Sequence, residues 1–371
     1  MKRRLPGLGS AAFLLLGFFL LLLLLTNARV AADGIRRGLS LCTETLFPSL
    51  FPFLVLSELL VARQAGKVLG KLFSRPVSAL FGLSGSGATA ILLGMLCGYP
   101  VGTSVAVALH RNEELSAEEL KRLMLFANNP SFGFLVGAVG VGLLGSKSAG
   151  IALWLIVWIS AALIGIFLRI AFGKLERTSR ALSGAGQKPP SVSDLTGSVT
   201  RGFHSLLQVF AFVIFFTCVA GCLTAILSAL HLPAALSVAI YGFLEITSGI
   251  SHAARTLAPE LAFRFSAFFA GFAGLSVCLQ LFSITEGLKL RIAPYLLAKV
   301  MQGGICFLLA DLYLRIFRPR FELAECIATF SQNVIQQRQS ILVLLFLPLA
   351  VLLISAFQKH ASHQKEKRLL R

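Results

Sequence analysis

The chain has 371 residues, of which 56% are hydrophobic and 13% are charged, and its mean hydropathy is +0.82. Soluble chains carry about 25% charged residues, so this composition excludes a soluble globular protein. The net charge of +18 then belongs to loops between membrane segments, where basic residues set topology, and we expect no nucleic-acid partner. The sequence therefore predicts an all-α integral membrane protein.

Eight segments have the length of about 20 apolar residues that crosses a bilayer. The first follows the basic sequence MKRR, and we expect it to remain as an uncleaved helix although it resembles a signal peptide. The predicted crossings are residues 10–28, 45–62, 123–145, 149–171, 205–228, 263–285, 294–316 and 340–357.

Two further apolar segments are interrupted by residues that do not continue a helix. Residues 79–109 are broken at GMLCGYPVGTS (94–104), and residues 234–254 are broken at GFLEITSGIS (242–251). Each is followed by another interruption, ANNPSFGF (127–134) and AGFAGLSV (270–277), and both Gly94 to Asn128 and Gly242 to Ser276 are 34 positions. Matched broken segments in two halves indicate the binding site of a secondary transporter.

The Lys and Arg residues predict the orientation. If the two broken segments are re-entrant hairpins and the other eight segments cross, basic residues favour one side by more than two to one, and both termini are cytoplasmic. The hairpins then enter from opposite faces. The predicted fold is about eight transmembrane helices plus two re-entrant hairpins arranged as inverted repeats, with partly unwound helices.

The breaks supply the candidate binding residues, because unwound backbone at membrane depth persists only inside protein or beside a wet cavity. Pro100 and the Asn129-Pro130 pair predict new half-helices, and Thr247 and Ser248 lie where a cap would fall. Such helix starts favour an anionic guest. The candidates are Gly98, Tyr99, Pro100, Gly102, Thr103, Asn128, Asn129, Ser131, Thr247, Ser248, Gly249, Ser276 and Gln280.

Glu245 is the candidate coupling residue, because ionisable groups inside a membrane are costly and often functional. It could bind a proton or a cation, or it could simply accept hydrogen bonds from a neighbouring backbone turn. For Asp311 we expect a pair with Arg315, and for His252 a structural role. The charged connector at residues 111–122 reads as a solvated face. The seven cysteines read as small packing residues, and we expect no metal and no cofactor.

These segments divide the chain. The predicted units are an N-terminal helix (1–33), a first gate-type repeat (34–172), a cytoplasmic linker (173–200), a second gate-type repeat (201–317), a loop with a C-terminal helix (318–358) and a basic cytoplasmic tail (359–371).

The motifs resemble those of the YlbJ (SpoVV) family of sporulation integral membrane proteins. The resemblance covers roughly residues 34–315 and rests on LFPSLFPFLVLSELL, GMLCGYPVGT, LMLFANNPSFGF, LEITSGIS and FAGFAGLSVCLQ. It implies two nucleoside-recognition gate modules, a distant relation to concentrative nucleoside transporters, and export of dipicolinic acid from the mother cell during endospore formation. The implied location is the mother-cell or outer forespore membrane.

We therefore expect a transporter that carries a small anionic solute by alternating access and that is not an enzyme. One alternative is a nucleoside or another small metabolite as the solute. An alternative of another class is a membrane scaffold for sporulation or envelope assembly. Beyond the solute and the lipid bilayer the sequence identifies no partner, and a homo-oligomer stays open.

Overall fold

The computed structural model describes residues 8–62, 65–99, 101–173, 175, 192–229, 234–288 and 290–317, and within these ranges all regular secondary structure is helical. This confirms the all-α class. The elements in chain order are α1 (Leu8–Thr26), α2 (Ala28–Ser40), the π-helix η1 (Leu41–Leu46), α3 (Phe47–Ala62), α4 (Ala65–Phe81), α5 (Gly85–Cys97), α6 (Val101–Arg111), α7 (Ala117–Phe126), the π-helix η2 (Gly133–Leu143), α8 (Lys147–Phe172), α9 (Val192–Ala229), α10 (Ala234–Leu244), α11 (Ile246–Thr256), α12 (Pro259–Phe272), α13 (Gly274–Ile284) and α14 (Ile292–Phe317).

Five helical stretches in the described ranges are long and apolar enough to cross a membrane. They are Ala28–Leu56, Lys147–Phe172, Leu195–Ile226, Pro259–Ile284 and Ile292–Phe317. The bent pair Gly70–Phe81 and Gly85–Met95, with 97° between its helices, would make a sixth. The chain is thus an integral membrane helical protein, and the count of eight crossings stays a prediction.

The long helix α8 shows the pattern of a lipid-facing span. Leu155, Ile159 and Leu163 recur every four residues on one face and are 46–49% exposed, whereas Leu153, Val157 and Ala161 on the opposite face are buried. An exposed apolar stripe of this kind is stable in lipid and not in water. The same helix therefore carries a membrane surface on one side and the protein core on the other.

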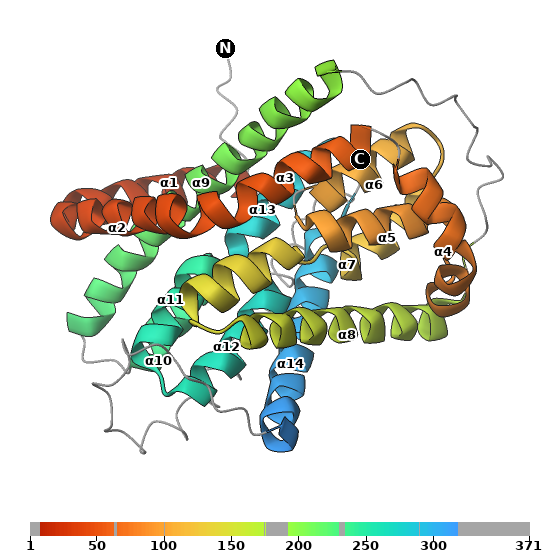
Figure 1. Cartoon of the computed structure of the whole chain (residues 1–371). Coiled ribbons are helices and arrows are strands. Elements are labelled where there is room, and N and C mark those ends of the chain that lie inside the picture. Colours follow the sequence, from red (N-terminus) through yellow and green to blue (C-terminus); the bar gives the residue numbers. More distant parts are fainter. Residues whose placement is uncertain are drawn as a thin grey trace, which may run out of the picture.

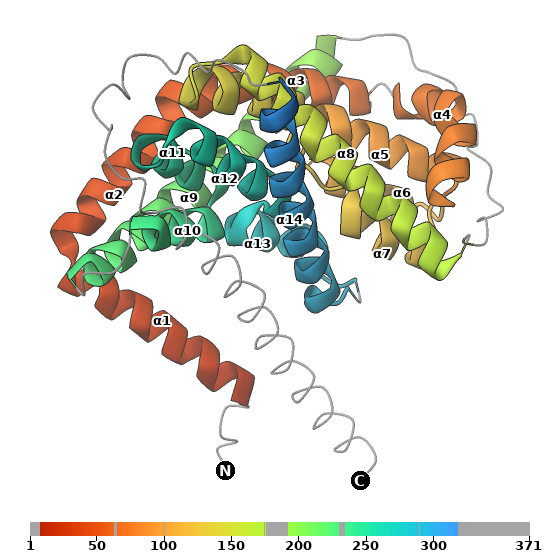
Figure 2. The same cartoon turned by 90° about the horizontal axis from the view of Figure 1, so that it is seen from below.

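Two series of short helices, each closed by a long one, make up more than half of the described residues. In Figure 1, α5 to α7 lie near the end of α8 that is close to α4, and α10 to α12 lie near its other end. The long helix α9 packs against α2 and α3, and α14 packs between α12 and α8. In Figure 2 the first helix, α1, projects away from this body. The series α5-α6-α7-η2-α8 and α10-α11-α12-α13-α14 have the same order of short and long elements.

All four interruptions predicted from the sequence are breaks between helices. They fall at Gly98, at residues 127–132, at Glu245 and at Ala273. The inverted arrangement of the two series relative to a membrane stays a prediction.

The charged segment at residues 111–122, which includes the first half of α7, differs from the solvated face that we expected. Glu119 is 1% exposed and accepts hydrogen bonds from the backbone nitrogens of Ser84 (2.7 Å) and Ser116 (3.2 Å). Arg122 is 7% exposed and donates to the backbone carbonyl of Gly173 (2.7 Å). These two charges satisfy backbone groups at the start of α5 and the end of α8, so they hold helix ends together.

Several predictions lie partly or wholly outside the described residues. They concern Pro100, most of the 173–200 linker and everything from residue 318 onward, including the C-terminal helix and the basic tail. Helix α9 begins at Val192, inside the segment that we expected to be a linker.

Candidate solute-binding site

The two breaks of the first series touch each other. Gly98 has φ +71° and ψ −169°, a conformation essentially restricted to glycine. A Cβ atom on Gly98 would lie 2.5 Å from the backbone nitrogen of Ser131, in the second break. A Cβ atom on Gly102 would lie 2.6 Å from the Cα atom of Gly94, although eight residues of continuous helix span about 12 Å. Helices α5 and α6 therefore fold back on each other.

The second series repeats this geometry. Ala273 and Gly274 both have positive φ values, +75° and +76°. A Cβ atom on Gly274 would lie 3.3 Å from the backbone nitrogen of Ile246 and 3.4 Å from the Cα atom of Glu245. Helices α10 and α11 fold back through a close approach of Gly242 and Gly249. Each series thus has a glycine-packed hairpin with a second break lying across it.

Glu245 is the N-cap of α11. It is 1% exposed, and its carboxylate accepts hydrogen bonds from the backbone nitrogens of Thr247 (2.9 Å) and Ser248 (2.6 Å). The expected cap at Thr247 or Ser248 is therefore wrong, because those residues form the first helical turn and donate to Glu245. A carboxylate at a helix N-terminus is favoured by the helix dipole. The chain itself thus supplies the anion that we expected a solute to bring to this helix start.

The other expected cap is also displaced. Asn129 donates its side-chain amide to the carbonyl of Phe126 (2.7 Å), and Ser131 accepts from the backbone nitrogen of Phe134 (3.2 Å). Ser131 therefore accepts a hydrogen bond from the first turn of η2, whose N-cap residue is Phe132.

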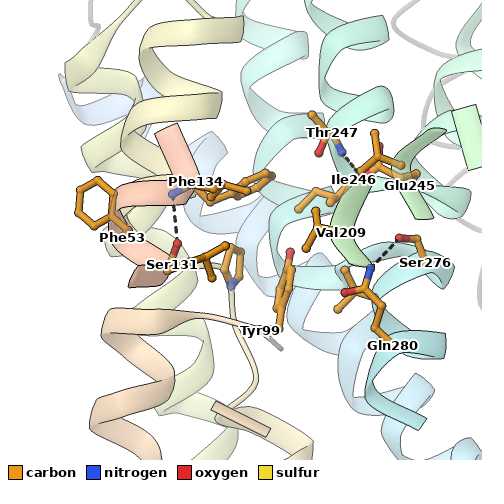
Figure 3. Close-up of a pocket in the computed structure, with 15 residues that line it drawn as sticks. Phe53, Tyr99, Ser131, Phe134, Val209, Glu245, Ile246, Thr247, Ser276 and Gln280 are labelled. Atoms are coloured by element: carbon orange, nitrogen blue, oxygen red, sulfur yellow. Dashed lines mark hydrogen bonds between the residues drawn. The ribbon is translucent and has the colours of Figure 1, made fainter. Parts of the chain in front are cut away.

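A pocket of about 570 Å³, including its opening, lies between the four breaks. Figure 3 shows Tyr99 standing between the Ser131 side and the side formed by Glu245 and Gln280. The polar lining comes from both series, and the apolar lining comes from α3, the break at residues 127–132, η2, α9, α11 and α13. The lining residues are Leu50, Phe53, Leu54, Tyr99, Pro130, Ser131, Phe134, Val209, Val213, Glu245, Ile246, Thr247, Ser276, Val277 and Gln280.

Two polar atoms that line this pocket have no hydrogen-bond partner among the residues that the structure describes. The hydroxyl of Tyr99 and the Oε1 atom of Gln280 are both buried without a hydrogen bond. The amide nitrogen of Gln280, by contrast, donates to Ser276 at 3.5 Å. An unpaired buried polar atom costs about 1–3 kcal/mol, and most such atoms are hydrogen-bonded in native proteins. A bound polar solute would give Tyr99 an acceptor and Gln280 a donor.

The charge of the pocket is acidic or neutral. Glu245 is an acid, and none of the other lining residues is Lys, Arg or His. The recognition groups are therefore hydroxyls, an amide and backbone atoms. Such a set suits hydrogen-bonding groups of a solute better than it suits two bare negative charges.

A fully buried lysine stabilises the broken backbone beside the pocket. Lys299 on α14 is 0% exposed and donates to the backbone carbonyl of Asn128 (2.5 Å), to Oε1 of Gln302 (2.9 Å) and to Oδ1 of Asn129 (3.4 Å). Gln302 also donates to Asn129 at 2.6 Å. All of these acceptors are uncharged. The amine of Lys299 is therefore held by oxygen atoms that the unwound backbone and its neighbours leave free.

The network extends toward α6 through Asn128. Its amide donates to the hydroxyl of Tyr295 (3.2 Å), and its oxygen accepts from Thr103 (3.0 Å). Thr103 and Asn128 thus orient the break and do not line the pocket.

The predicted binding residues separate into groups. Those that line the pocket are Tyr99, Ser131, Thr247, Ser276 and Gln280, together with Glu245. Thr103, Asn128 and Asn129 belong to the lysine network, and Gly98, Gly102 and Gly249 make close helix contacts. Ser248 lies outside this pocket and is hydrogen-bonded to Thr217.

The residues that sequence reasoning missed are Lys299 and Gln302. Their signal was present, because Lys299 is a charge within an apolar span and Gln302 follows it by one helical turn. Other expectations are confirmed: Asp311 pairs with Arg315 at 2.7 Å. The cysteines found free and buried are Cys42, Cys218, Cys222, Cys278 and Cys306.

The fold and the site together define a multi-pass helical membrane protein with broken helices around a pocket that combines apolar side chains with polar groups from both series. Neither a protein-family profile nor a solved structure matches the chain. The chain is 28% identical to the sporulation integral membrane protein YlbJ of Bacillus subtilis (strain 168), over 324 aligned residues that cover 78% of this chain and 79% of the relative. The chain is therefore similar to YlbJ over most of its length, and the gate modules implied by that resemblance stay a prediction.

Proposed function

We propose that this protein is a secondary transporter that carries a small polar metabolite through the pocket between the four breaks. The observation that carries the proposal is the pair of unpartnered atoms on Tyr99 and Gln280, which come from different series and face the same pocket. A structural core would pair these atoms or replace them with apolar groups. A solute that binds and leaves accounts for both.

Alternating access is the proposed mechanism. The two glycine-packed hairpins meet the pocket from separate series, so movement of one series against the other would change which side of the pocket is open. The breaks provide positions that can absorb changes in φ and ψ. Glu245 is the proposed coupling group, because it lines the pocket and also caps α11. Binding of a proton to its carboxylate would weaken that cap.

Dipicolinic acid is the first substrate that we propose, with export from the mother cell toward the forespore as its direction. The support is the relative's printed name, a sporulation integral membrane protein, together with the family resemblance. The protein would then lie in the mother-cell or outer forespore membrane, with both termini in the cytoplasm.

A nucleoside, or another uncharged polar metabolite, is the second candidate. The observation that favours it is the lack of any basic residue among those that line the pocket. Hydroxyl and amide groups would pair with Tyr99 and Gln280 without the cost of burying two charges. Dipicolinate would need its carboxylates to be recognised by neutral donors or to enter protonated.

Uptake into vesicles separates these substrates. The purified protein is reconstituted in liposomes, and labelled dipicolinate is supplied under an imposed proton gradient or sodium gradient, with uridine and adenosine as competitors. Saturable uptake that nucleosides do not inhibit would support dipicolinate. Uptake of labelled nucleoside with no dipicolinate flux would replace it with the second candidate.

A membrane scaffold remains the alternative of another class. Substitutions at Asn129 or Glu245 discriminate poorly, because Asn129 accepts from Gln302 and Glu245 caps α11, so either change also perturbs folding. Substitutions at Tyr99 and Gln280 discriminate better between a transporter and a scaffold, because the unpartnered atoms of these two residues contribute no protein hydrogen bond. A scaffold would tolerate both changes.

A further inference from the structure

A second pocket lies beside the first and has the opposite electrical character. It encloses about 1140 Å³, including its open mouth. Its lining comes mainly from α2, η1 and α11, with smaller contributions from η2, α9 and α10. The residues are Arg36, Arg37, Ser40, Leu41, Glu44, Thr45, Gly142, Leu143, Thr217, Tyr241, Ser248, Ser251, His252 and Arg255.

The basic groups of this pocket exceed its acidic groups. Three arginines and His252 line it, against one carboxylate, Glu44. Arg36 forms a solvent-exposed pair with Asp33 at 3.2 Å. Arg37 and Arg255 have no hydrogen bond and no ion pair with any residue of the described ranges. Two guanidinium groups from different helices are thus free to bind.

The chemistry of these groups points to an oxyanion. Guanidinium groups bind carboxylate and phosphate through two parallel hydrogen bonds. The hydroxyl groups of Ser40, Ser251 and Tyr241 line the same pocket and can donate as well. The ring of His252 packs against that of Tyr241, with centroids 4.6 Å apart. The pocket therefore offers the positive charge that the central pocket lacks.

The two pockets meet at consecutive residues of α11. Thr247 lines the central pocket and Ser248 lines the basic pocket. The side chains of Ser248 and Thr217 are joined by a hydrogen bond, and both residues are buried. Glu245 binds the backbone nitrogens of Thr247 and Ser248. The start of α11, which Glu245 caps, thus lines both the central pocket and the basic pocket. The Thr217–Ser248 hydrogen bond lies at the basic pocket.

We propose that the basic pocket is a second binding site for a small soluble oxyanion, held by Arg37 and Arg255, and that it is the vestibule from which an anionic solute reaches the central pocket. The binding site stands on the free arginines alone, whereas its role as a vestibule rests on the proposed function. A membrane lipid headgroup has the same phosphate chemistry, so the two sources of oxyanion need separate arms in the experiment.

The experiment is calorimetric titration of dipicolinate, and separately of inorganic phosphate, into the full-length protein in phosphatidylcholine nanodiscs at low salt. The test variant is Arg37→Gln with Arg255→Gln. The matched control is Arg29→Gln, because Arg29 is an exposed arginine on the same helix, α2, and does not line the pocket. Gln280→Leu serves as the central-pocket variant.

The expected result is phosphate binding that survives Arg29→Gln and weakens at least tenfold in the arginine double variant. Dipicolinate binding should show the same difference when both variants also carry Gln280→Leu, which removes the contribution of the central pocket. Binding at exposed guanidinium groups should also weaken as salt rises. Equal affinity in the double variant and the control, or no binding of either anion to the wild type, would overturn the proposal.

A lipid arm decides the source of the oxyanion. The titration is repeated with nanodiscs that contain phosphatidylglycerol, and thermal stabilisation by that lipid is measured for each variant. Stabilisation by phosphatidylglycerol that depends on Arg37 and Arg255, without binding of either soluble anion, would assign the site to a headgroup and overturn the soluble-anion proposal. Soluble-anion binding without flux in vesicles would instead retain the site and refute only the transport function.

Discussion

Replacement of Gly98 by alanine tests the close contact between the first two breaks, at Gly98 and Ser131. The backbone of Gly98 lies in a region that is essentially restricted to glycine, and a side chain there costs about 1–3 kcal/mol. The added Cβ atom would also lie 2.5 Å from the nitrogen of Ser131, and overpacking of this kind costs a further ~1–3 kcal/mol. The expected loss of stability is therefore about 2–6 kcal/mol, and even its lower bound shifts a folding equilibrium roughly thirtyfold.

The measurement is the apparent melting temperature of the detergent-purified protein. Gly304→Ala is the matched control, because a Cβ atom there meets nothing within 4 Å and alanine is favoured over glycine inside a helix by about 0.5–1 kcal/mol. We expect Gly98→Ala to melt well below the wild type and Gly304→Ala to melt at or above it. Equal melting temperatures of the two variants would refute the close contact between the two breaks.

Two further predictions concern buried charges. Lys299→Met should destabilise the protein strongly, because it leaves the Asn128 carbonyl and the Gln302 oxygen without their donor, at about 1–3 kcal/mol for each unpaired group. The measurement is thermal melting beside the control variant Lys147→Met, which replaces an exposed lysine at the start of α8. Equal melting temperatures of the two variants would contradict the prediction. Glu119→Leu should lower the melting temperature more than Glu119→Gln, because glutamine retains an oxygen that can accept a hydrogen bond from the Ser84 nitrogen. The reverse order of melting temperatures would show that this hydrogen bond does not stabilise the start of α5.

The sequence predicted the breaks because their causes are local. Glycine at positive φ, as at Gly98, and polar residues inside apolar runs, as at Glu245, interrupt a helix whatever surrounds them. Sequence reasoning also found the residues whose unpartnered atoms line the pocket, Tyr99 and Gln280. Both residues follow breaks in the two series, and the equal 34-residue spacing of the breaks had already matched one series to the other.

The long-range contacts could not be predicted in the same way. Lys299 meets Asn128 across 171 positions, and Arg122 meets Gly173 across 51. No local pattern specifies which carbonyl a buried cation will find. Reading the charges of the connector as solvated failed for this reason, since Glu119 and Arg122 satisfy helix ends that are distant in the sequence. The basic pocket was missed likewise, because its arginines come from α2 and α11.

The most direct test of the account is solute flux in vesicles through Gln280→Leu. The substitution keeps a similar side-chain size, removes the Oε1 atom that has no hydrogen-bond partner among the described residues, and gives up only the long 3.5 Å hydrogen bond to Ser276, so the protein should fold and reconstitute normally. Leu279→Met, on an exposed position of the same helix, is the control. With labelled dipicolinate or uridine, whichever the wild type carries, we predict at least a tenfold loss of flux in Gln280→Leu at equal protein and no loss in the control. Unchanged flux in Gln280→Leu, or no flux of either solute in the wild type, would contradict transport through this pocket.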